Sequence, residues 1–161
     1  MPFTPFHLGP ALLIALLLFP LIDIFVICVA SVIIDIEPAY YLFIAGRGAY
    51  HGFLHTLLGG TLISLLISPV LYYMRKLYLK IIDAFGLKQD TSFKKIVASS
   101  LIGVYGHILL DSFLYPEMNP LYPLQGNPLL YLIPAHVVYE ICILSFLLAI
   151  PLYIYRIKKQ A

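Results

Sequence analysis

Long apolar stretches constrain the fold of this chain more than any other feature of the sequence. Residues 51–78, 92–114 and 128–156 are mostly apolar, and their few charged residues lie mainly near the ends. A helix of about 20 apolar residues crosses the hydrocarbon core of a bilayer and satisfies its own backbone hydrogen bonds there. Over the whole chain, 61% of residues are hydrophobic and 11% are charged, unlike a soluble domain. We therefore predict an all-α, polytopic membrane bundle of about five helices, forming the single domain 1–161.

The first apolar stretch, residues 8–34, is interrupted by Pro20 and by Asp23. A single span would put a proline inside the helix and a carboxylate near the middle of the membrane, and both are costly. We predict instead a helical hairpin over 8–34, with two short arms that turn between these two residues. The second arm is expected to end before Pro38, because the residue before a proline disfavours the helical conformation. Residues 39–50 are then expected to form an interfacial loop or a short helix.

Capping residues mark the starts of two of the three longer helices. Thr91 or Ser92 can accept a hydrogen bond from the first turn of the helix that follows it. Asn127 followed by Pro128 combines a favoured N-cap with a favoured first helical residue, so the last helix is expected to begin there. We predict long transmembrane helices over three ranges: 51–78, 92–114 and 128–156.

The basic residues predict how the bundle crosses the membrane. Nine of the ten lysines and arginines lie between residues 75 and 95 or after residue 155, and only Arg47 lies elsewhere. By the positive-inside rule, we predict a multi-pass protein of the cell membrane whose loop 79–91 and C-terminus are cytoplasmic. All five histidines then gather at the outer face. Because the net charge of +2 follows this membrane pattern, we expect membrane lipids and no nucleic acid as partners. The oligomeric state stays open.

Three pairs of metal-binding side chains are spaced four residues apart, which places both members of a pair on one face of a helix. These pairs are His51 with His55, His107 with Asp111, and His136 with Glu140. The hairpin adds three residues at the same end: His7, Asp35 and Glu37. Ionisable groups inside membrane segments are costly unless they pair or coordinate, so we predict a functional site.

Imidazole and carboxylate groups are the ligands of zinc and related divalent ions. We predict one or two divalent ions, with zinc as the expected metal, and seven ligands: His7, Asp35, His51, His55, His107, Asp111 and His136. Glu37 and Glu140 are predicted to act as a general base or to orient a ligand histidine. Glu117 is expected to be exposed and structural.

The sequence around these residues resembles a known family. The motifs are His7-Leu8, Asp35-Ile36-Glu37-Pro38, the segment from His51 to Leu58, and Gly106-His107-Ile108-Leu109-Leu110-Asp111 leading to Pro120-Leu121-Tyr122-Pro123. Over nearly the whole chain they resemble the YdjM-type family of membrane-bound metal-dependent hydrolases. The histidine motif of that family reads His-Arg-Gly-x-Thr-His-Ser, and here Tyr50 replaces its first histidine and His51 its arginine.

The resemblance implies a metal-dependent hydrolase, and a glutamate in the last helix is a family feature that favours Glu140. A fainter likeness links the pairs of His107 and His136 to zinc-dependent phospholipase C enzymes, which are all-helical and use His-x-x-x-Asp and His-x-x-x-Glu ligands. That likeness implies a phosphoester of a lipid, by analogy of spacing alone.

We predict hydrolysis of an ester or phosphoester, lipid-linked, at the outer membrane face. A divalent ion with an open coordination position activates water for such a reaction. One alternative is a non-catalytic membrane protein in which the same ligands hold a structural or transport-related metal. A second alternative is a metal-free module that binds lipid headgroups or a protein partner through its aromatic outer loops.

Overall fold

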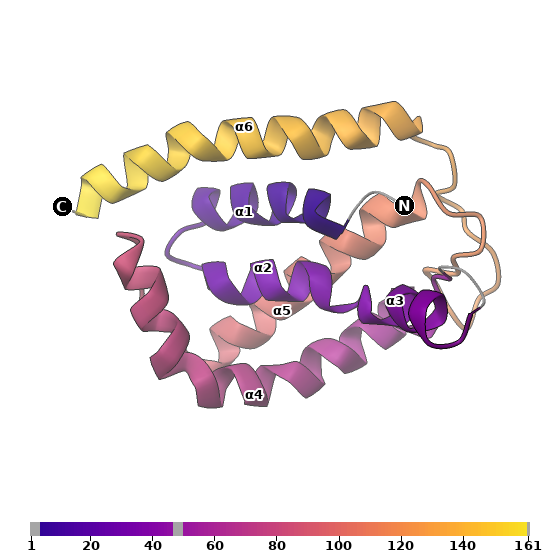
Figure 1. Cartoon of the computed structure of the whole chain (residues 1–161), viewed down its shortest axis with the longest axis horizontal. Coiled ribbons are helices and arrows are strands. Elements are labelled where there is room, and N and C mark those ends of the chain that lie inside the picture. The colour runs from indigo at the N-terminus through magenta and orange to yellow at the C-terminus, as the bar shows by residue number, and fades with distance from the viewer. Residues whose placement is uncertain (1–3, 47–49, 161) are drawn as a thin grey trace.

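A computed structural model of the protein describes residues 4–46 and 50–160, and the regular secondary structure in these ranges is helical throughout (Figure 1). The described elements are η1 (Thr4–His7), α1 (Leu8–Leu17), α2 (Ile24–Ile33), α3 (Ile36–Phe43), η2 (Phe53–His55), α4 (Leu57–Ala84), α5 (Phe93–Ser112) and α6 (Ala135–Gln160). Four segments are long and apolar enough to cross a membrane: Ile24–Phe43, Leu57–Ala84, Phe93–Ser112 and Ala135–Gln160. The predicted all-α membrane bundle is therefore confirmed. Arg47 lies outside the described residues.

The N-terminal hairpin is confirmed, and a buried carboxylate holds its turn. α1 and α2 lie side by side and are joined by residues 18–23 (Figure 1). Asp23 is fully buried and caps α2, accepting hydrogen bonds at 3.2 Å from the backbone amides of Phe25 and Val26. The same carboxylate accepts hydrogen bonds from the Tyr78 hydroxyl at 2.9 Å and from the Gln89 side-chain amide at 3.1 Å. Asp23 thus joins the hairpin to α4 and to the segment before α5.

Small residues set the distances between the helices. α5 packs against both α2 and α4, and a Cβ atom at Gly103 would lie 2.5 Å from the Ile27 carbonyl oxygen of α2. α6 lies along α1 (Figure 1), where a Cβ atom at Gly9 would lie 2.5 Å from the Cys142 carbonyl oxygen. Any larger side chain at these two positions would push the helices apart, so glycine permits the close packing that membrane helices depend on.

The second arm ends before Pro38 as expected, because α2 ends at Ile33, within the predicted hairpin 8–34. Pro38 is not the cause of this end, since it lies in the first turn of α3, where the missing N–H of proline costs no hydrogen bond. Another expected boundary is wrong. The helix expected over 51–78 starts later, at Leu57. Thr56 caps it by accepting a hydrogen bond from the Gly59 amide at 2.9 Å. His51 and His55 therefore precede α4 instead of sharing its first turns.

Ser92 caps α5 as predicted and accepts a hydrogen bond from the Lys95 amide. The predicted start of the last helix is wrong. α6 begins at Ala135, not at residue 128. The Asn127 side-chain amide donates to the carbonyl oxygens of Ser112 and Tyr115, at 2.8 and 3.1 Å. Asn127 thus holds the connecting segment 113–134 against the end of α5 instead of capping a helix. The residues that follow it, 128–134, form turns and bends.

The molecule has two chemically different ends (Figure 1). One end, which we call the basic end, consists of the α1–α2 turn, the second half of α4, residues 85–95 and the end of α6, and the lysines and arginines of the described ranges gather there. α4 contains Pro69 and bends, so that its last turns cross this end. We call histidine end the opposite one, formed by η1, α3, η2 and residues 113–134. Which end faces the cytoplasm stays a prediction from the positive-inside rule.

Replacing Asp23 by alanine is expected to lower the free energy of unfolding by about 2–4 kcal/mol, because the cap of α2 and two buried donors lose their acceptor. Asp23→Asn keeps one acceptor oxygen and should lose clearly less. Denaturant unfolding of the purified protein in detergent micelles measures both variants. Wild-type stability of Asp23→Ala would contradict the role assigned to this carboxylate.

Candidate metal centre

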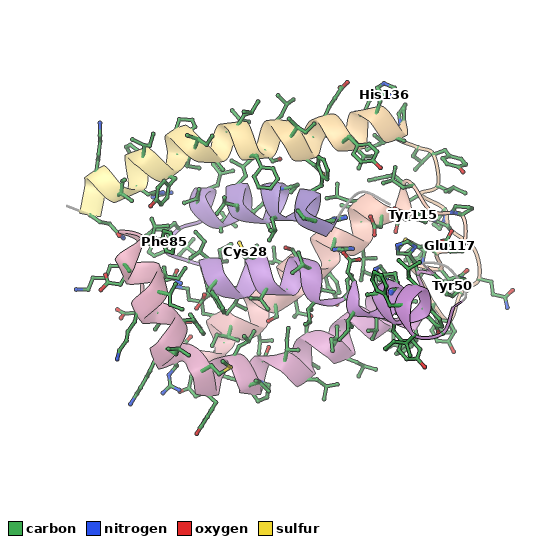
Figure 2. The ribbon with its side chains drawn as sticks, viewed as in Figure 1. Cys28, Tyr50, Phe85, Tyr115, Glu117 and His136 are labelled. Atoms are coloured by element: carbon green, nitrogen blue, oxygen red, sulfur yellow. The ribbon has the colours of Figure 1, made fainter. Side chains whose placement is uncertain are left out.

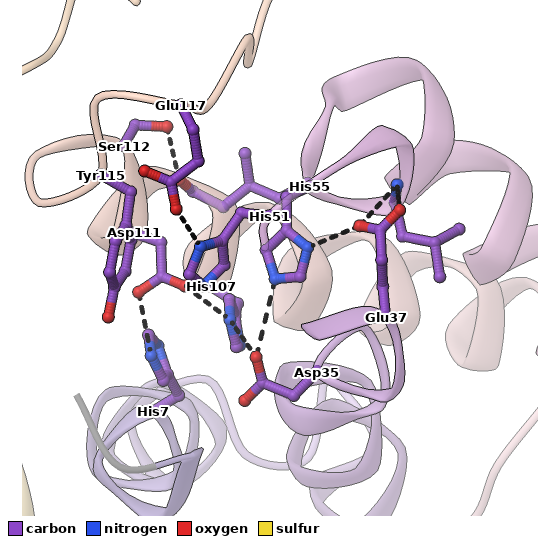
Figure 3. Close-up of polar contacts among 12 residues, drawn as sticks. His7, Asp35, Glu37, His51, His55, His107, Asp111, Ser112, Tyr115 and Glu117 are labelled. Atoms are coloured by element: carbon purple, nitrogen blue, oxygen red, sulfur yellow. Dashed lines mark hydrogen bonds and ion pairs between the residues drawn. The ribbon is translucent and has the colours of Figure 1, made fainter. Parts of the chain in front are cut away.

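Imidazole and carboxylate groups from four separate parts of the chain meet inside the histidine end (Figure 3). Asp35 comes from the junction of α2 and α3, His55 from η2, and His107 and Asp111 from successive turns of α5. One ligand atom from each of these four residues lies within 4.8 Å of the others. His7, the last residue of η1, completes the group from the N-terminal side. These residues could hold a metal ion.

Hydrogen bonds fix which way the His107 ring faces. Its Nδ1 lies 2.5 Å from the carbonyl oxygen of Ser31, and because a carbonyl only accepts, Nδ1 carries the proton and donates. Its Nε2 lies 3.1 Å from Asp111 Oδ2 and 3.3 Å from Asp35 Oδ1. In the neutral ring the Nε2 lone pair thus points at two carboxylates, an arrangement that a proton or a cation stabilises.

His55 has the same arrangement, with a glutamate in place of the carbonyl. Its Nδ1 donates to Glu37 Oε2 at 3.0 Å, and its Nε2 lies 3.6 Å from Asp35 Oδ1. Glu37 is itself held by the backbone amides of Gly52 and Leu54, at 3.0 to 3.2 Å. Burial opposes protonation of His55, but its contacts with the two carboxylates outweigh burial and raise its pKa. Glu37 therefore fixes the orientation of the His55 ring, which suits one of the two roles predicted for it, that of orienting a histidine that could bind a metal.

His51 is a third imidazole whose Nδ1 donates a hydrogen bond outside the group while its Nε2 faces an aspartate. Its Nδ1 donates to Glu117 Oε1 at 2.9 Å, and its Nε2 lies 3.8 Å from Asp111 Oδ2. The ring is buried and stacks on the Tyr115 ring at 3.9 Å between centroids. Burial outweighs the carboxylates and lowers the pKa of His51, which keeps the ring neutral near pH 7. His51 thus lies at the edge of the group, close to it but outside the four residues whose ligand atoms converge.

His7 reaches the same carboxylate from the other side. Its Nε2 lies 3.2 Å from Asp111 Oδ1, and its ring stacks on His107 with 3.7 Å between centroids. The hairpin therefore brings the N-terminal histidine to the same end of the bundle as His107, as the sequence predicted. His7 Nδ1 is buried and has no hydrogen-bond partner among the described residues.

The residues present fit a divalent cation. Asp111 Oδ1 and His55 Nε2 are buried and make no hydrogen bond of good geometry in the described part of the chain; their contacts are the ion pairs with His7 Nε2 at 3.2 Å and with Asp35 Oδ1 at 3.6 Å. Each of the three oriented imidazoles turns its Nε2 toward an aspartate. The two aspartates carry two negative charges, which one divalent ion balances. Ligand atoms of a tetrahedral zinc site lie about 3.4 Å apart, because each bond is about 2.1 Å long. The four ligand atoms, which lie within 4.8 Å of one another, would therefore have to move closer together around an ion, by up to about 1.4 Å.

The third predicted pair does not join this group. His136 and Glu140 are both exposed, and Figure 2 shows His136 on the side of α6 that faces away from α1. α6 buries Val138 and Cys142 instead. Because residues two positions apart on a helix point about 200° apart, burying Val138 turns His136 outward. The helical pairing of His51 with His55 is wrong as well, since both precede α4, yet their rings lie 4.8 Å apart.

Sequence reasoning missed three contributors to the site. Glu117 was expected to be exposed and structural, but its side chain is only 28% exposed and accepts the hydrogen bond of His51. Tyr115 packs on His51, and burial raises its pKa, so its phenol stays neutral. The Ser31 carbonyl orients His107. No local spacing links these residues to their partners, because they come from distant parts of the chain.

A cavity of about 330 Å³ lies at the histidine end. It is lined by Tyr41, Tyr50, His51, Gly52, Phe53, Thr56, Asn119 and Tyr122. Among these residues, His51 is the one that also contacts Asp111. The cavity therefore borders the candidate metal centre through the His51 ring, and aromatic rings and a few polar groups make up the rest of its lining.

Comparison with protein-family models, with curated proteins and with solved structures finds no match to this chain. The resemblance to the YdjM-type family therefore rests on the motifs quoted above and stays a prediction.

The metal content of histidine variants tests the centre. Wild-type protein purified without chelator is expected to contain at least one divalent ion per chain. His107→Ala should lose it, because the ring contacts both aspartates. His136→Ala, an exposed histidine at the same end, should keep it. Elemental analysis by plasma mass spectrometry measures all three proteins. Equal metal content in the two variants would exclude His107 as a ligand.

Glutamate variants test the orienting role of Glu37. Glu37→Ala is expected to weaken metal affinity about 10–100-fold, the usual cost of removing a carboxylate that orients a ligand histidine. Glu140→Ala, which removes an exposed carboxylate, should retain wild-type affinity. Competition with a fluorescent chelator gives the affinities. Metal affinity that falls in Glu140→Ala and not in Glu37→Ala would reverse this assignment.

Proposed function

We propose that this protein is a membrane-embedded, metal-dependent hydrolase that acts on a lipid-linked ester or phosphoester. The observation that carries the proposal is the convergence of Asp35, His55, His107 and Asp111 within 4.8 Å. A cavity lies beside this group, bordered by His51. Catalytic zinc sites keep a coordination position for water or substrate, and zinc can expand from four to five ligands. A centre of four protein ligands next to a cavity suits catalysis if water or substrate adds the fifth ligand from the cavity side.

Each residue of the centre has a distinct part in this proposal. Asp35, His55, His107 and Asp111 hold the ion, with zinc as the proposed metal. When bound, the ion supplies Lewis-acid activation of a water molecule or of a substrate oxygen. Glu37 keeps the proton of His55 on Nδ1, so that Nε2 is free to act as a ligand.

His51 links the centre to the cavity. Glu117 holds the Nδ1 proton of its ring, and the neutral Nε2 faces Asp111. In this orientation Nε2 can accept a hydrogen bond from water or from a substrate hydroxyl that enters the cavity. Tyr115 packs against the ring and limits its rotation. His51 is therefore proposed as a positioning residue and not as one of the four ligands.

The surroundings of the cavity suit an amphiphilic substrate. Tyr41, Tyr50, Phe53 and Tyr122 contribute aromatic rings to its lining, and Asn119 contributes an amide. Aromatic side chains with a polar atom favour the boundary between lipid and water. A lipid could place its headgroup in this cavity while its acyl chains remain in the bilayer. This placement favours a lipid-linked ester or phosphoester over a soluble one.

Transport of the metal across the membrane is the main alternative to hydrolysis, and the few buried polar groups of the described bundle argue against it. Toward the basic end, the interior of the described bundle offers the hydroxyls of Ser64, Ser68, Ser99 and Ser100. The next carboxylate, Asp23, already accepts four hydrogen bonds. A divalent ion crossing the bundle would need oxygen or nitrogen ligands along its whole path.

Hydrolysis assays on the purified protein in detergent test the proposal. A panel of lipid phosphoesters and carboxylic esters is expected to contain at least one substrate, and a chelator should abolish its hydrolysis. Asp111→Asn is expected to lower the rate at least about 100-fold, because the variant loses a ligand of the ion. Glu140→Gln, matched in chemistry, should retain the rate.

A metal-loaded protein that hydrolyses no member of the panel would contradict the hydrolase. Metal-dependent ion flux into proteoliposomes would then favour the transport alternative, and its absence a structural metal.

A further inference from the structure

The basic end contains a second cavity, at the opposite end of the bundle from the metal centre (Figure 1). Its volume is about 430 Å³, and its lining combines the hairpin turn, the segment after α4 and the end of α6. The lining residues are Phe19, Pro20, Lys88, Asp90, Arg156, Lys159 and Gln160. The proposed hydrolase uses none of them, so the cavity calls for a separate explanation.

Arg156 is held in a fixed orientation at this cavity. Its Nε and Nη2 donate hydrogen bonds at 3.0 Å to the carbonyl oxygens of Leu16 and Leu17, the last residues of α1. Its guanidinium lies 5.8 Å from the centre of the Phe19 ring. Neither hydrogen bond uses Nη1, so the guanidinium keeps N–H groups that can bind an anion.

The wall opposite the hairpin is also fixed by hydrogen bonds. The Gln160 side-chain amide accepts a hydrogen bond from the Lys88 backbone amide at 2.7 Å and donates one to the Lys88 carbonyl oxygen at 2.9 Å. The Tyr153 hydroxyl donates to the Phe85 carbonyl oxygen at 2.6 Å. These bonds hold the segment after α4 against the end of α6. Lys88 and Lys159 therefore border one cavity although they are distant in sequence.

The charge of the lining selects an anion. Three cations, Lys88, Arg156 and Lys159, face one carboxylate, Asp90, which leaves an excess of two positive charges. A guanidinium binds two phosphate oxygens at once, and lysine ammonium groups add mobile positive charges around it. Phosphate is therefore the group that these donors suit best.

Apolar surface beside the cavity indicates the source of the phosphate. Phe19 and Pro20 belong to the lining, and Leu17, Leu18 and Leu21 of the same turn are 56%, 42% and 76% exposed. A free phosphate ion would gain nothing from contact with this apolar surface, because it has no apolar groups, whereas acyl chains would cover the surface and remove it from water. We propose that this cavity binds the phosphodiester headgroup of an anionic phospholipid whose acyl chains lie along the hairpin turn. Such a lipid bridges α6 and the hairpin and stabilises the bundle.

The test uses the full-length protein purified in dodecyl maltoside, with phosphatidylglycerol as the probe and native mass spectrometry to count bound lipids. Lys88→Ala combined with Lys159→Ala is expected to weaken the tightest phosphatidylglycerol binding about 10–30-fold, since each lysine near a lipid phosphate contributes about a factor of five. The matched control combines Lys76→Ala with Lys94→Ala. It removes the same charge from exposed positions of the basic end outside the described lining, and should bind as wild type.

Three results would overturn the proposal. Equal weakening in the two double variants would show that charge alone attracts the lipid. Equal affinity for phosphatidylcholine would show that the cavity does not select an anion. Displacement of the lipid by a few millimolar inorganic phosphate would identify a site for free phosphate instead.

Lys88→Arg with Lys159→Arg should restore binding, which separates loss of charge from misfolding. Because no assay here involves metal or hydrolysis, the outcome is independent of the proposed hydrolase.

Discussion

The arrangement of the histidine end depends on the contacts that the Asp111 carboxylate makes with three imidazole rings. Its oxygens lie 3.2 Å from His7 Nε2, 3.1 Å from His107 Nε2 and 3.8 Å from His51 Nε2. These imidazoles come from the N-terminal turn, from α5 and from the segment before α4, so one buried side chain gathers three parts of the chain. An ionised carboxylate in such an apolar interior is strongly destabilising unless positive charge or donors surround it. A cation bound at the centre would meet that requirement.

The two buried aspartates at opposite ends of the bundle illustrate how partners decide a role. Asp23 accepts four hydrogen bonds from backbone amides, a phenol and a side-chain amide, so its charge is satisfied by the protein itself. Asp111 faces imidazole nitrogens, and the contact of its Oδ1 is an ion pair with His7 at 3.2 Å without good hydrogen-bond geometry. The first arrangement stabilises the fold, whereas the second leaves a requirement that a metal ion can meet. Residue type and burial are alike at both sites.

The two cavities extend this contrast to the lipid environment. At the histidine end, a cavity lined by aromatic rings borders the imidazole and carboxylate group through His51, which suits the proposed substrate that meets a metal ion. At the basic end, the held guanidinium of Arg156 and two lysines lie next to exposed leucines, which suits the proposed anionic lipid. The bundle between them is packed tightly through Gly103 and Gly9. A tightly packed scaffold of this kind keeps the residues of each end in their relative positions.

Local spacing and hydrophobicity determined the helical membrane fold, the hairpin at Pro20 and Asp23, the Ser92 cap and the pairing of His107 with Asp111. These features depend on residues within a few positions of each other, where helix geometry is fixed. Only the tertiary structure decided that His55 and His51 face the centre while His136 and Glu140 face outward. It also decided that Glu117 orients the His51 ring and that the Ser31 carbonyl orients the His107 ring. The reason is that spacing places residues on a common face of a helix, whereas packing against other helices selects which face turns inward and where the helix begins.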